Sequence, residues 1–281
     1  MINKLQKGFY FLEKKAYEKG WLKANAQHLP DFIGIGAQKS GTTWLYLNLK
    51  QHPDIQFAKR IIREDGKWVK LPLDQKELRY FKNNDRFYSP MHHYTRHFED
   101  LDSSKLKGEI TPDYAIMGRD RIRFMHTIMP NAKLILLVRN PIQRAWSHAK
   151  MDLVKRGGQS IEQLSDETVW NHFNGQGAIS RGSYSRILDK YYQFFPKEQL
   201  FVGFYEDIST EPEALFINIL QFLGLSTEQL DLSRYPLSDR VGSGIEKAIP
   251  EKYYQKLLQL YGPEIKRFAE KYEPRAGGWI N

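Results

Sequence analysis

The chain has 281 residues, which suits one large α/β domain or two small ones with a substantial buried core. Its 42 Lys and Arg outnumber 33 Asp and Glu, and the net charge of +9 attracts anions such as nucleotides, nucleic acids and acidic glycans without choosing among them. The absence of cysteine excludes disulfides and thiolate metal sites, and it favours a reducing compartment.

Neither a signal peptide nor a membrane span is predicted. Lysine and glutamate interrupt every apolar run in residues 1–30, and no stretch reaches the roughly 20 apolar residues that cross a bilayer. We therefore expect a cytoplasmic protein without integral membrane association.

An amphipathic helix is predicted for residues 2–27, where apolar side chains recur at helical spacing among many lysines. The apolar positions are Leu5, Phe9, Leu12, Ala16 and Trp21. Such a helix lies either on a membrane surface or on its own domain. The second role is the commoner one, so we expect residues 1–30 to be a helical extension packed on a single domain that spans residues 1–281.

A strand, a loop and a helix are predicted in residues 31–50, with the sequence DFIGIGAQKSGTTWLYLNLK. Residues 32–36 have the composition of a short buried strand, and a helix runs from Thr42 to about His52. Either Thr42 or Thr43 can cap the start of this helix with its hydroxyl group.

The loop of residues 37–41 has the features of an anion site. A cationic side chain, Lys39, stands beside a helix N-terminus, whose amide groups and dipole favour negative charge. Gly41 relieves the tight turn before the helix. The order differs from that of a nucleotide P-loop, G-x-x-x-x-G-K-[ST], because Lys39 comes before Gly41 instead of after it.

Glu77 stands in a charged segment that follows a stretch of weak periodicity. Residues 55–74 are expected to form a loop or a short strand. The carboxyl of Glu77 is then surrounded in sequence by the cations Lys76, Arg79 and Lys82. On these residues alone, the segment is a surface charge cluster.

Three histidines lie in the polar region of residues 83–104. His92, His93 and His97 have the spacing H-H-x-x-x-H, but no acid or fourth ligand stands at a suitable distance for a metal site. We interpret the region as a loop that faces a substrate.

Two further strands precede a second candidate anion site. The strand at residues 107–110 stops at Pro112, and the continuous apolar run at residues 133–138 is typical of a central strand buried on both faces. Arg139 follows directly, and Ser147 stands about two turns into the next helix. A phosphate can therefore lie between a guanidinium and a hydroxyl group.

The second half of the chain is predicted to contain several helices, one strand and one loop. The expected elements are a helix within the polar region 157–182, an aromatic helix at 183–195, a strand at 199–205, helices at 212–223, 250–259 and 262–272, and a mobile loop at 234–244. Trp44 is a candidate for stacking on a nucleobase, because aromatic faces suit nucleobases.

Four segments resemble sequence motifs of sulfotransferases that use 3′-phosphoadenosine 5′-phosphosulfate (PAPS), especially heparan-type and bacterial enzymes. K-S-G-T-T-W resembles their 5′-phosphosulfate loop, and R-N-P-I-Q-R-A-W-S matches their 3′-phosphate element. K-E-L-R-Y-F resembles the segment that carries their general base, and G-E-I-T-P-D-Y resembles another segment of the same enzymes. The resemblance covers about residues 31–223, in the family's order.

The resemblance implies a P-loop-like three-layer α/β/α fold with a central, mostly parallel sheet. It implies that Glu77 is the general base, with Glu109 as the alternative, and that Lys39 acts in catalysis. A loop near Arg240 is expected to close over the 3′-phosphate, although R-V-G replaces the family's R-K-G. The implied donor-binding residues are Lys39, Ser40, Gly41, Thr42, Thr43, Trp44, Arg139, Ser147 and Tyr205.

The implied reaction moves a sulfuryl group from PAPS to a hydroxyl or amine of a glycan, a lipid or a small metabolite. The product of the donor is 3′-phosphoadenosine 5′-phosphate (PAP), and neither a metal nor a nucleic acid takes part. Two alternatives remain open at this point, a P-loop-type nucleotide kinase and a non-catalytic protein that binds polyanions. The sequence does not indicate the oligomeric state.

Overall fold

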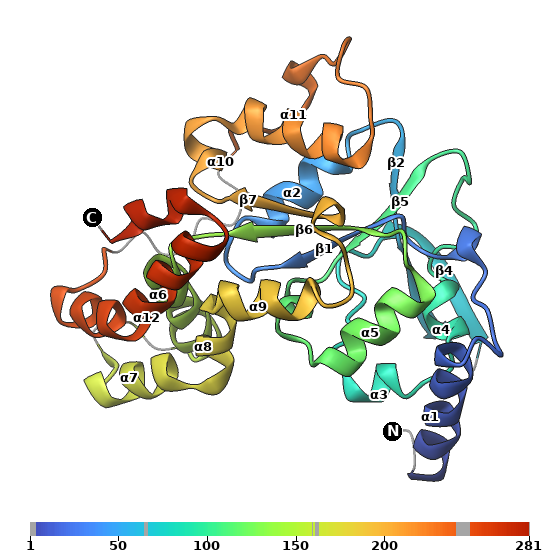
Figure 1. The fold of residues 1–281 in the computed structure, drawn as a ribbon, viewed down its shortest axis with the longest axis horizontal. Helices are drawn as coiled ribbons and strands as arrows, with labels where there is room; N and C mark the ends of the chain where they lie inside the picture. Colours follow the sequence, from blue (N-terminus) through green and yellow to red (C-terminus); the bar gives the residue numbers. More distant parts are fainter. Residues whose placement is uncertain (1–3, 65–66, 159, 161–162, 240–247, 281) are drawn as a thin grey trace.

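A five-stranded parallel sheet forms the centre of the computed structural model, which describes residues 4–64, 67–158, 160, 163–239 and 248–280 (Figure 1). Its strands, in the spatial order β2-β5-β1-β6-β7, are β2 (Ile55–Phe57), β5 (Leu106–Ile110), β1 (Phe32–Gly36), β6 (Lys133–Val138) and β7 (Leu200–Phe204). The strands predicted at residues 32–36, 107–110, 133–138 and 199–205 are confirmed within a residue or two. The continuous apolar run of residues 133–138, buried on both faces, is the clearest of these signals.

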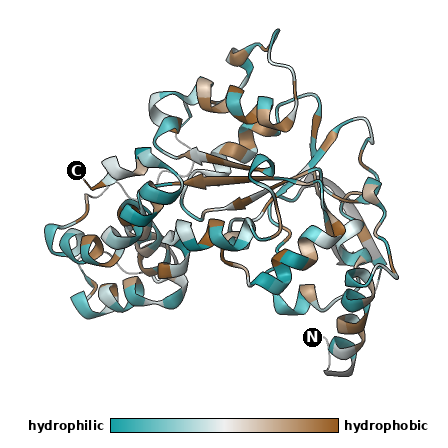
Figure 2. Cartoon of the chain, viewed as in Figure 1, coloured by the Kyte–Doolittle hydropathy of each residue, from teal (hydrophilic) through white to brown (hydrophobic). Residues whose placement is uncertain are grey.

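Helices cover both faces of this sheet, so the predicted α/β architecture is confirmed (Figure 1). On one face, α2 (Thr42–Leu49) and α11 (Pro212–Leu223) share an apolar cluster with the strands, and α5 (Arg119–Ile128) and α9 (Tyr184–Tyr191) share another on the opposite face. Figure 2 shows the central strands as hydrophobic and the surrounding helices as mixed, because each helix buries one stripe.

The remaining helices complete the two outer layers. They are α1 (Lys4–Glu18), α3 (Asn84–Phe87), α4 (His92–Thr95), α6 (Pro141–Ala149), α7 (Asp166–Asn174), α8 (Gln176–Gly182), α10 (Asp207–Thr210) and α12 (Glu251–Lys271). A π-helical turn, Lys150–Arg156, continues α6. Within the described residues, no helix has the length and apolarity needed to cross a membrane.

The order of the strands places the topological switch point of the sheet at the carboxyl end of β1. The chain runs from β1 to the strands on one side, β2 and β5, and then crosses to β6 and β7 on the other side. Open parallel sheets bind ligands where the strand order reverses in this way, outside the carboxyl ends of the strands. The loop of residues 37–41 leaves β1 at this point.

Three predicted elements differ from the structure. Residues 55–74 contain not only β2 but also an antiparallel hairpin of β3 (Lys59–Glu64) and β4 (Lys67–Asp74). Residues 157–182 contain two helices, α7 and α8, instead of one.

The two helices predicted at residues 250–259 and 262–272 are one helix, α12. Pro263 lies inside it, and a proline at such a position costs about 3 kcal/mol. The helix continues because Leu257, Tyr261, Ile265 and Phe268 are buried on both sides of the proline.

Helix α1 lies on the domain, but the predicted apolar stripe does not face it. Phe9 and Leu12 are 67% and 66% exposed, whereas Lys14 is 4% exposed. The helix therefore packs through its more polar face, which the spacing of apolar residues did not predict.

Candidate active site

The loop after β1 is shaped for close approach by a ligand. The amide of Ala37 donates to Leu137 on β6 at 2.8 Å, and the amide of Ser40 donates back to Ala37 at 3.2 Å. Lys39 has a φ of 71° and Gly41 a φ of 86°, so both lie in the left-handed region. Strained backbone of this kind gathers at ligand sites.

The predicted hydroxyl cap of α2 is wrong. Gly41 is the N-cap, and no side chain caps the helix. Thr42 and Thr43 instead direct their hydroxyl groups towards Lys76, whose Nζ lies 3.4 Å and 3.1 Å from the two oxygens. Without a side-chain cap, the positive end of the helix is available to a bound anion.

Lys76 is a site residue that the sequence analysis did not single out. Burial lowers the pKa of its ammonium group to about 8, partly offset by the neighbouring carboxylate of Glu77. A cation of this kind, at the start of a helix, adds to the positive field of the loop. Its position directly before Glu77, in a segment thought to be a surface cluster, was the only signal in the sequence.

Arg139 joins the second anion element to the first. Its Nη1 donates to the backbone oxygen of Lys39 at 3.3 Å, and its guanidinium lies over the ring of Tyr205 at 4.2 Å from the centroid. Tyr205 in turn packs on Gly41, where a Cβ atom would lie 3.2 Å from the ring. The carboxyl ends of β1, β6 and β7 thus meet around one guanidinium group.

Tyr184 fixes the backbone at this junction. Its buried hydroxyl donates to the backbone oxygen of Arg139 at 2.8 Å and accepts from the amide of the same residue at 3.2 Å. Burial raises the pKa of Tyr184, which keeps the hydroxyl protonated. The sequence analysis explained the aromatic residues of this helix by core packing and missed this role.

Other residues predicted to bind the donor do not contact Arg139 or Lys39 in the hydrogen bonds described above. Ser40 is fully buried in the loop, and Ser147 is half-buried two turns into α6, with no hydrogen bond to Arg139 in the part of the chain that the structure describes. Trp44 is 2% exposed, and its Nε1 donates to the backbone oxygen of Leu237 at 2.8 Å. Trp44 is thus a core residue of this structure, and its contact with a nucleobase stays a prediction. Arg240 lies outside the described residues.

Glu77 lies in a backbone segment that is attached to β5 and the residues after it. The amide of Ile110 donates to the backbone oxygen of Lys76 at 2.9 Å, and the amide of Arg79 donates to the hydroxyl of Thr111 at 3.3 Å. The half-buried carboxyl of Glu77 accepts from Arg79 Nε at 2.9 Å and Nη2 at 2.6 Å. Both bonds go to Oε2, which leaves Oε1 as the oxygen that faces away from this ion pair.

Glu109, the alternative base, is fully buried. Its carboxyl accepts hydrogen bonds from the hydroxyl groups of Tyr94 at 2.8 Å, Thr111 at 2.9 Å and Tyr114 at 3.1 Å, and from the amide of Leu78 at 3.4 Å. Burial raises the pKa of Glu109 to about 7, although these hydrogen bonds oppose the shift. A side chain enclosed in this way is suited to positioning the segment that carries Glu77 and unsuited to contact with an acceptor.

Histidines occur in two clusters outside this centre. His97 Nδ1 is bonded to the backbone of Lys59 at 2.7 Å, while His92 and His93 lie on the short helix α4. In the described residues, only His148, Asp152 and His172 bring three potential ligand atoms within 4.8 Å of one another.

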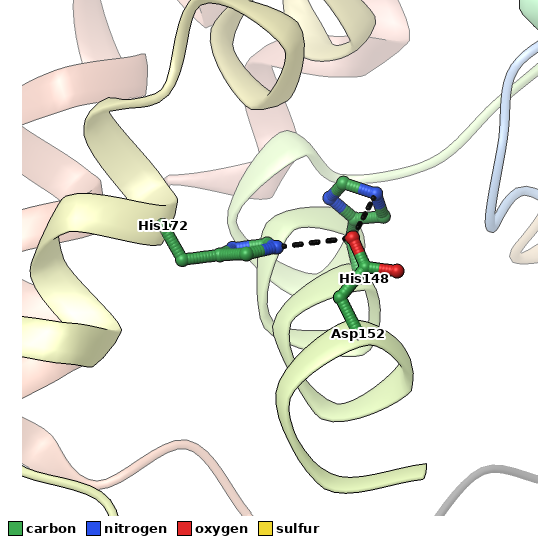
Figure 3. A group of neighbouring side chains, drawn as sticks. All are labelled: His148, Asp152 and His172. Atoms are coloured by element: carbon green, nitrogen blue, oxygen red, sulfur yellow. Dashed lines mark hydrogen bonds and ion pairs between the residues drawn. The ribbon is translucent and has the colours of Figure 1, made fainter. Parts of the chain in front are cut away.

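These three side chains form a hydrogen-bonded bridge between α7 and the helical segment that continues α6 (Figure 3). Asp152 Oδ2 lies 3.1 Å from His148 Nε2 and 3.3 Å from His172 Nε2. Both Nδ1 atoms are buried and have no hydrogen-bond partner among the described residues, whereas metal-binding histidines almost always donate from the second ring nitrogen. We therefore interpret the cluster as a structural bridge.

Sequence comparison identifies relatives of this chain. The family model described as "Sulfotransferase family" matches residues 30–229 of this chain. Membrane-associated sulfotransferase kil1 of Dictyostelium discoideum is 26% identical in an alignment of 286 positions, and the alignment covers 70% of this chain and 56% of the relative. Heparan sulfate glucosamine 3-O-sulfotransferase 3B1 of Mus musculus is 28% identical over 211 residues, which cover 72% of this chain and 48% of the relative. The chain spans about half the length of these relatives.

Solved structures share the fold. A sulfotransferase from Alicyclobacillus acidocaldarius matches with a TM-score of 0.64 and 22% identity, over 86% of this chain and 95% of that one. Mouse sulfotransferase SULT7A1 complexed with PAP matches with a TM-score of 0.55 and 12% identity, over 94% and 91%. The likeness confirms the P-loop-like α/β fold that the sequence motifs implied.

The buried carboxyl of Glu109 predicts a pH dependence of stability. Its pKa is about 7 in the fold against 4.5 when exposed, so the folded state holds the proton more tightly. Glu109 therefore contributes on the order of 3 kcal/mol to the free energy of unfolding below pH 4.5, and this contribution is lost as the pH rises to 7. We expect Glu109→Gln to abolish this part of the slope in urea unfolding curves recorded across the range.

Glu198→Gln is the matched control, because Glu198 is exposed and the substitution makes the same change in charge at the surface. It should retain the wild-type slope. Parallel profiles for the wild type and Glu109→Gln would contradict the assignment.

Proposed function

Because the chain belongs to the sulfotransferase family, we propose that it moves the sulfuryl group of PAPS to a hydroxyl or amine of an acceptor. The observation that carries this proposal is the contact between Arg139 and the backbone of Lys39 at 3.3 Å. It brings two anion-binding elements together at the switch point of the sheet. A donor with phosphate groups at both ends of one nucleoside fits two adjoining sites of this kind.

The 5′-phosphosulfate is proposed to bind in the loop of residues 37–43. Lys39 and Lys76 supply positive charge, and the uncapped amides at the start of α2 supply hydrogen bonds. Glycine suits position 41 because its φ of 86° lies in the left-handed region, which other residues rarely adopt. Ser40, Thr42 and Thr43 complete the loop.

The 3′-phosphate is proposed to bind between Arg139 and Ser147, with Tyr205 next to the adenine. Tyr205 holds the guanidinium through the ring contact at 4.2 Å, and Tyr184 holds its backbone. Because one face of the Tyr205 ring is covered by Arg139, the base would contact another part of this ring.

Transfer is proposed to occur by in-line displacement at sulfur. The acceptor oxygen or nitrogen forms a bond to sulfur while the bond from sulfur to the bridging oxygen breaks, and that electron pair remains on the departing 5′-phosphate. Glu77, through Oε1, takes the acceptor proton. Lys39, Lys76 and the helix amides stabilise the charge that builds on the leaving group, without a metal.

The acceptor is proposed to enter on the side of Glu77 and Arg79. Relatives whose names specify an acceptor act on heparan sulfate, which favours a sugar hydroxyl or amine as the first class to test. Arg79 holds Glu77 and has a φ of 57°, an unusual backbone conformation for an arginine. Its guanidinium is therefore placed to select the acceptor as well as to orient the base.

Thermal unfolding with nucleotides tests the proposed donor. We expect PAP to raise the Tm more than AMP or ATP does, since a ligand that binds only the folded state stabilises it by about 2.7 kcal/mol at 100 times its Kd. A larger shift with ATP and Mg²⁺ would indicate a kinase. A Tm shift that is the same with and without the 3′-phosphate, and that falls steeply with salt concentration, would indicate a general polyanion binder.

Glu77→Gln separates the base from donor binding. With radiolabelled PAPS and the best acceptor found in a screen of glycans, lipids and small metabolites, turnover should fall about 10²- to 10⁴-fold, because proton removal is lost. The affinity for PAP should stay the same. Glu228→Gln, at an exposed carboxylate, is the control for the charge change. Turnover retained in Glu77→Gln would reject Glu77 as the base.

Lys76 predicts how donor binding depends on pH. Its pKa is about 8, and a bound anion stabilises the charged form, so PAP affinity should fall as pH rises through 8. Lys76→Arg keeps its charge and should flatten this fall in calorimetric titrations. Lys190 has the same lowered pKa of about 8 but is bonded to Met117, so Lys190→Arg should keep the wild-type profile. An unchanged fall in Lys76→Arg would exclude Lys76 from the donor site.

A further inference from the structure

Helix α1 is attached to the domain through one face. Lys14 is 4% exposed and donates from Nζ to the backbone oxygen of Ser89 at 3.1 Å and to the hydroxyl of Tyr80. Tyr17 packs edge-on against Phe124 of α5, with ring centroids 6.2 Å apart. The buried face is thus fixed by a lysine and a tyrosine, and the helix projects along the side of the domain (Figure 1).

The outward face is the apolar one. Phe9 and Leu12 are 67% and 66% exposed, and Trp21, in the turn after the helix, is 79% exposed. Phe11 and Leu22 are exposed at 47% and 43%. These five are the large hydrophobic side chains exposed to this degree in the described part of the chain, and all lie between residues 9 and 22. Single exposed apolar residues are normal, whereas a cluster of them marks an interaction surface.

Positive charge accompanies this apolar face. Residues 1–23 contain six lysines and two glutamates. Lys19 and Lys23 are exposed on either side of Trp21 and Leu22, so cationic and aromatic side chains alternate along the turn. An exposed face with phenylalanine, leucine and tryptophan beside lysines has the chemistry of a helix that lies in the interface of an anionic membrane.

We propose that α1 and residues 19–23 form a docking surface for an anionic lipid membrane. In this arrangement Phe9, Leu12 and Trp21 enter the boundary between headgroups and acyl chains, and Lys19 and Lys23 contact the anionic headgroups. The helix lies in the plane of the membrane and does not cross it. The sequence analysis named this role as the alternative to packing on the domain; α1 packs through one face, and the exposed apolar face supports the second role beside it.

Vesicle sedimentation tests the docking surface with three variants of the full chain. Phe9→Ser/Leu12→Ser/Trp21→Ser removes the apolar contacts, and Lys19→Glu/Lys23→Glu reverses the charge. Lys197→Glu/Lys266→Glu makes the same change in charge at exposed lysines on other elements, and serves as the control. The vesicles contain phosphatidylcholine alone, or phosphatidylcholine and phosphatidylserine mixed two to one.

The wild type and the control should bind the mixed vesicles and bind neutral vesicles much more weakly. The apolar and the charge-reversed variants should each lose about tenfold or more in partition coefficient, and the charge-dependent part should weaken with salt. All variants should keep the wild-type Tm, because the altered side chains are exposed.

Three results would overturn the proposal. The wild type could fail to sediment with mixed vesicles, or the apolar variant could bind as well as the wild type. The wild type could also form a concentration-dependent dimer that the apolar variant abolishes, without binding vesicles. The last result would assign the stripe to contact between two copies of the chain.

Discussion

The contact between Arg139 and the backbone oxygen of Lys39 is the constraint on which the rest of the site depends. These residues are separated by a hundred positions in sequence, and the parallel pairing of β1 and β6 makes them neighbours. The ring of Tyr205 contacts the guanidinium of Arg139 and also packs against Gly41. The carboxyl end of a third strand, β7, therefore contributes to this contact. A loop with left-handed residues keeps its shape only when surrounding contacts of this kind fix it.

Burial and charge act against each other throughout this centre. The ammonium group of Lys76 is partly buried, and the carboxyl group of Glu109 lies in the core. Glu109 nevertheless has four donors around it, and one of them, the amide of Leu78, attaches the backbone after Glu77 to β5. The backbone before Glu77 is attached to the same strand through the amide of Ile110, which donates to the backbone oxygen of Lys76. The site therefore combines a buried layer that positions the reactive segment with a more exposed layer of cations that holds an anion.

Sequence patterns predicted the strands and the two anion elements because their signals are local. A few neighbouring residues are enough to predict the strand at residues 133–138 and the strand, loop and helix of residues 31–50. What failed depended on distant contacts. Thr42 and Thr43 do not cap α2, and their hydroxyl groups instead accept from the ammonium group of Lys76, more than thirty residues further along the chain. The partners of α1 lie more than sixty residues away, so its spacing revealed an apolar face without revealing which way that face points.

The central claim is that Lys39 and Arg139 hold opposite ends of one adenosine bisphosphate, and calorimetric titration with PAP and AMP tests it most directly. For the wild type, the account predicts an affinity for PAP at least about tenfold higher than for AMP, a difference of about 1.4 kcal/mol. Arg139→Ala should weaken PAP much more than AMP and so remove this difference, because AMP lacks the 3′-phosphate, whereas Lys39→Ala should weaken both ligands alike. An Arg139→Ala protein that still prefers PAP by the wild-type ratio would contradict the account.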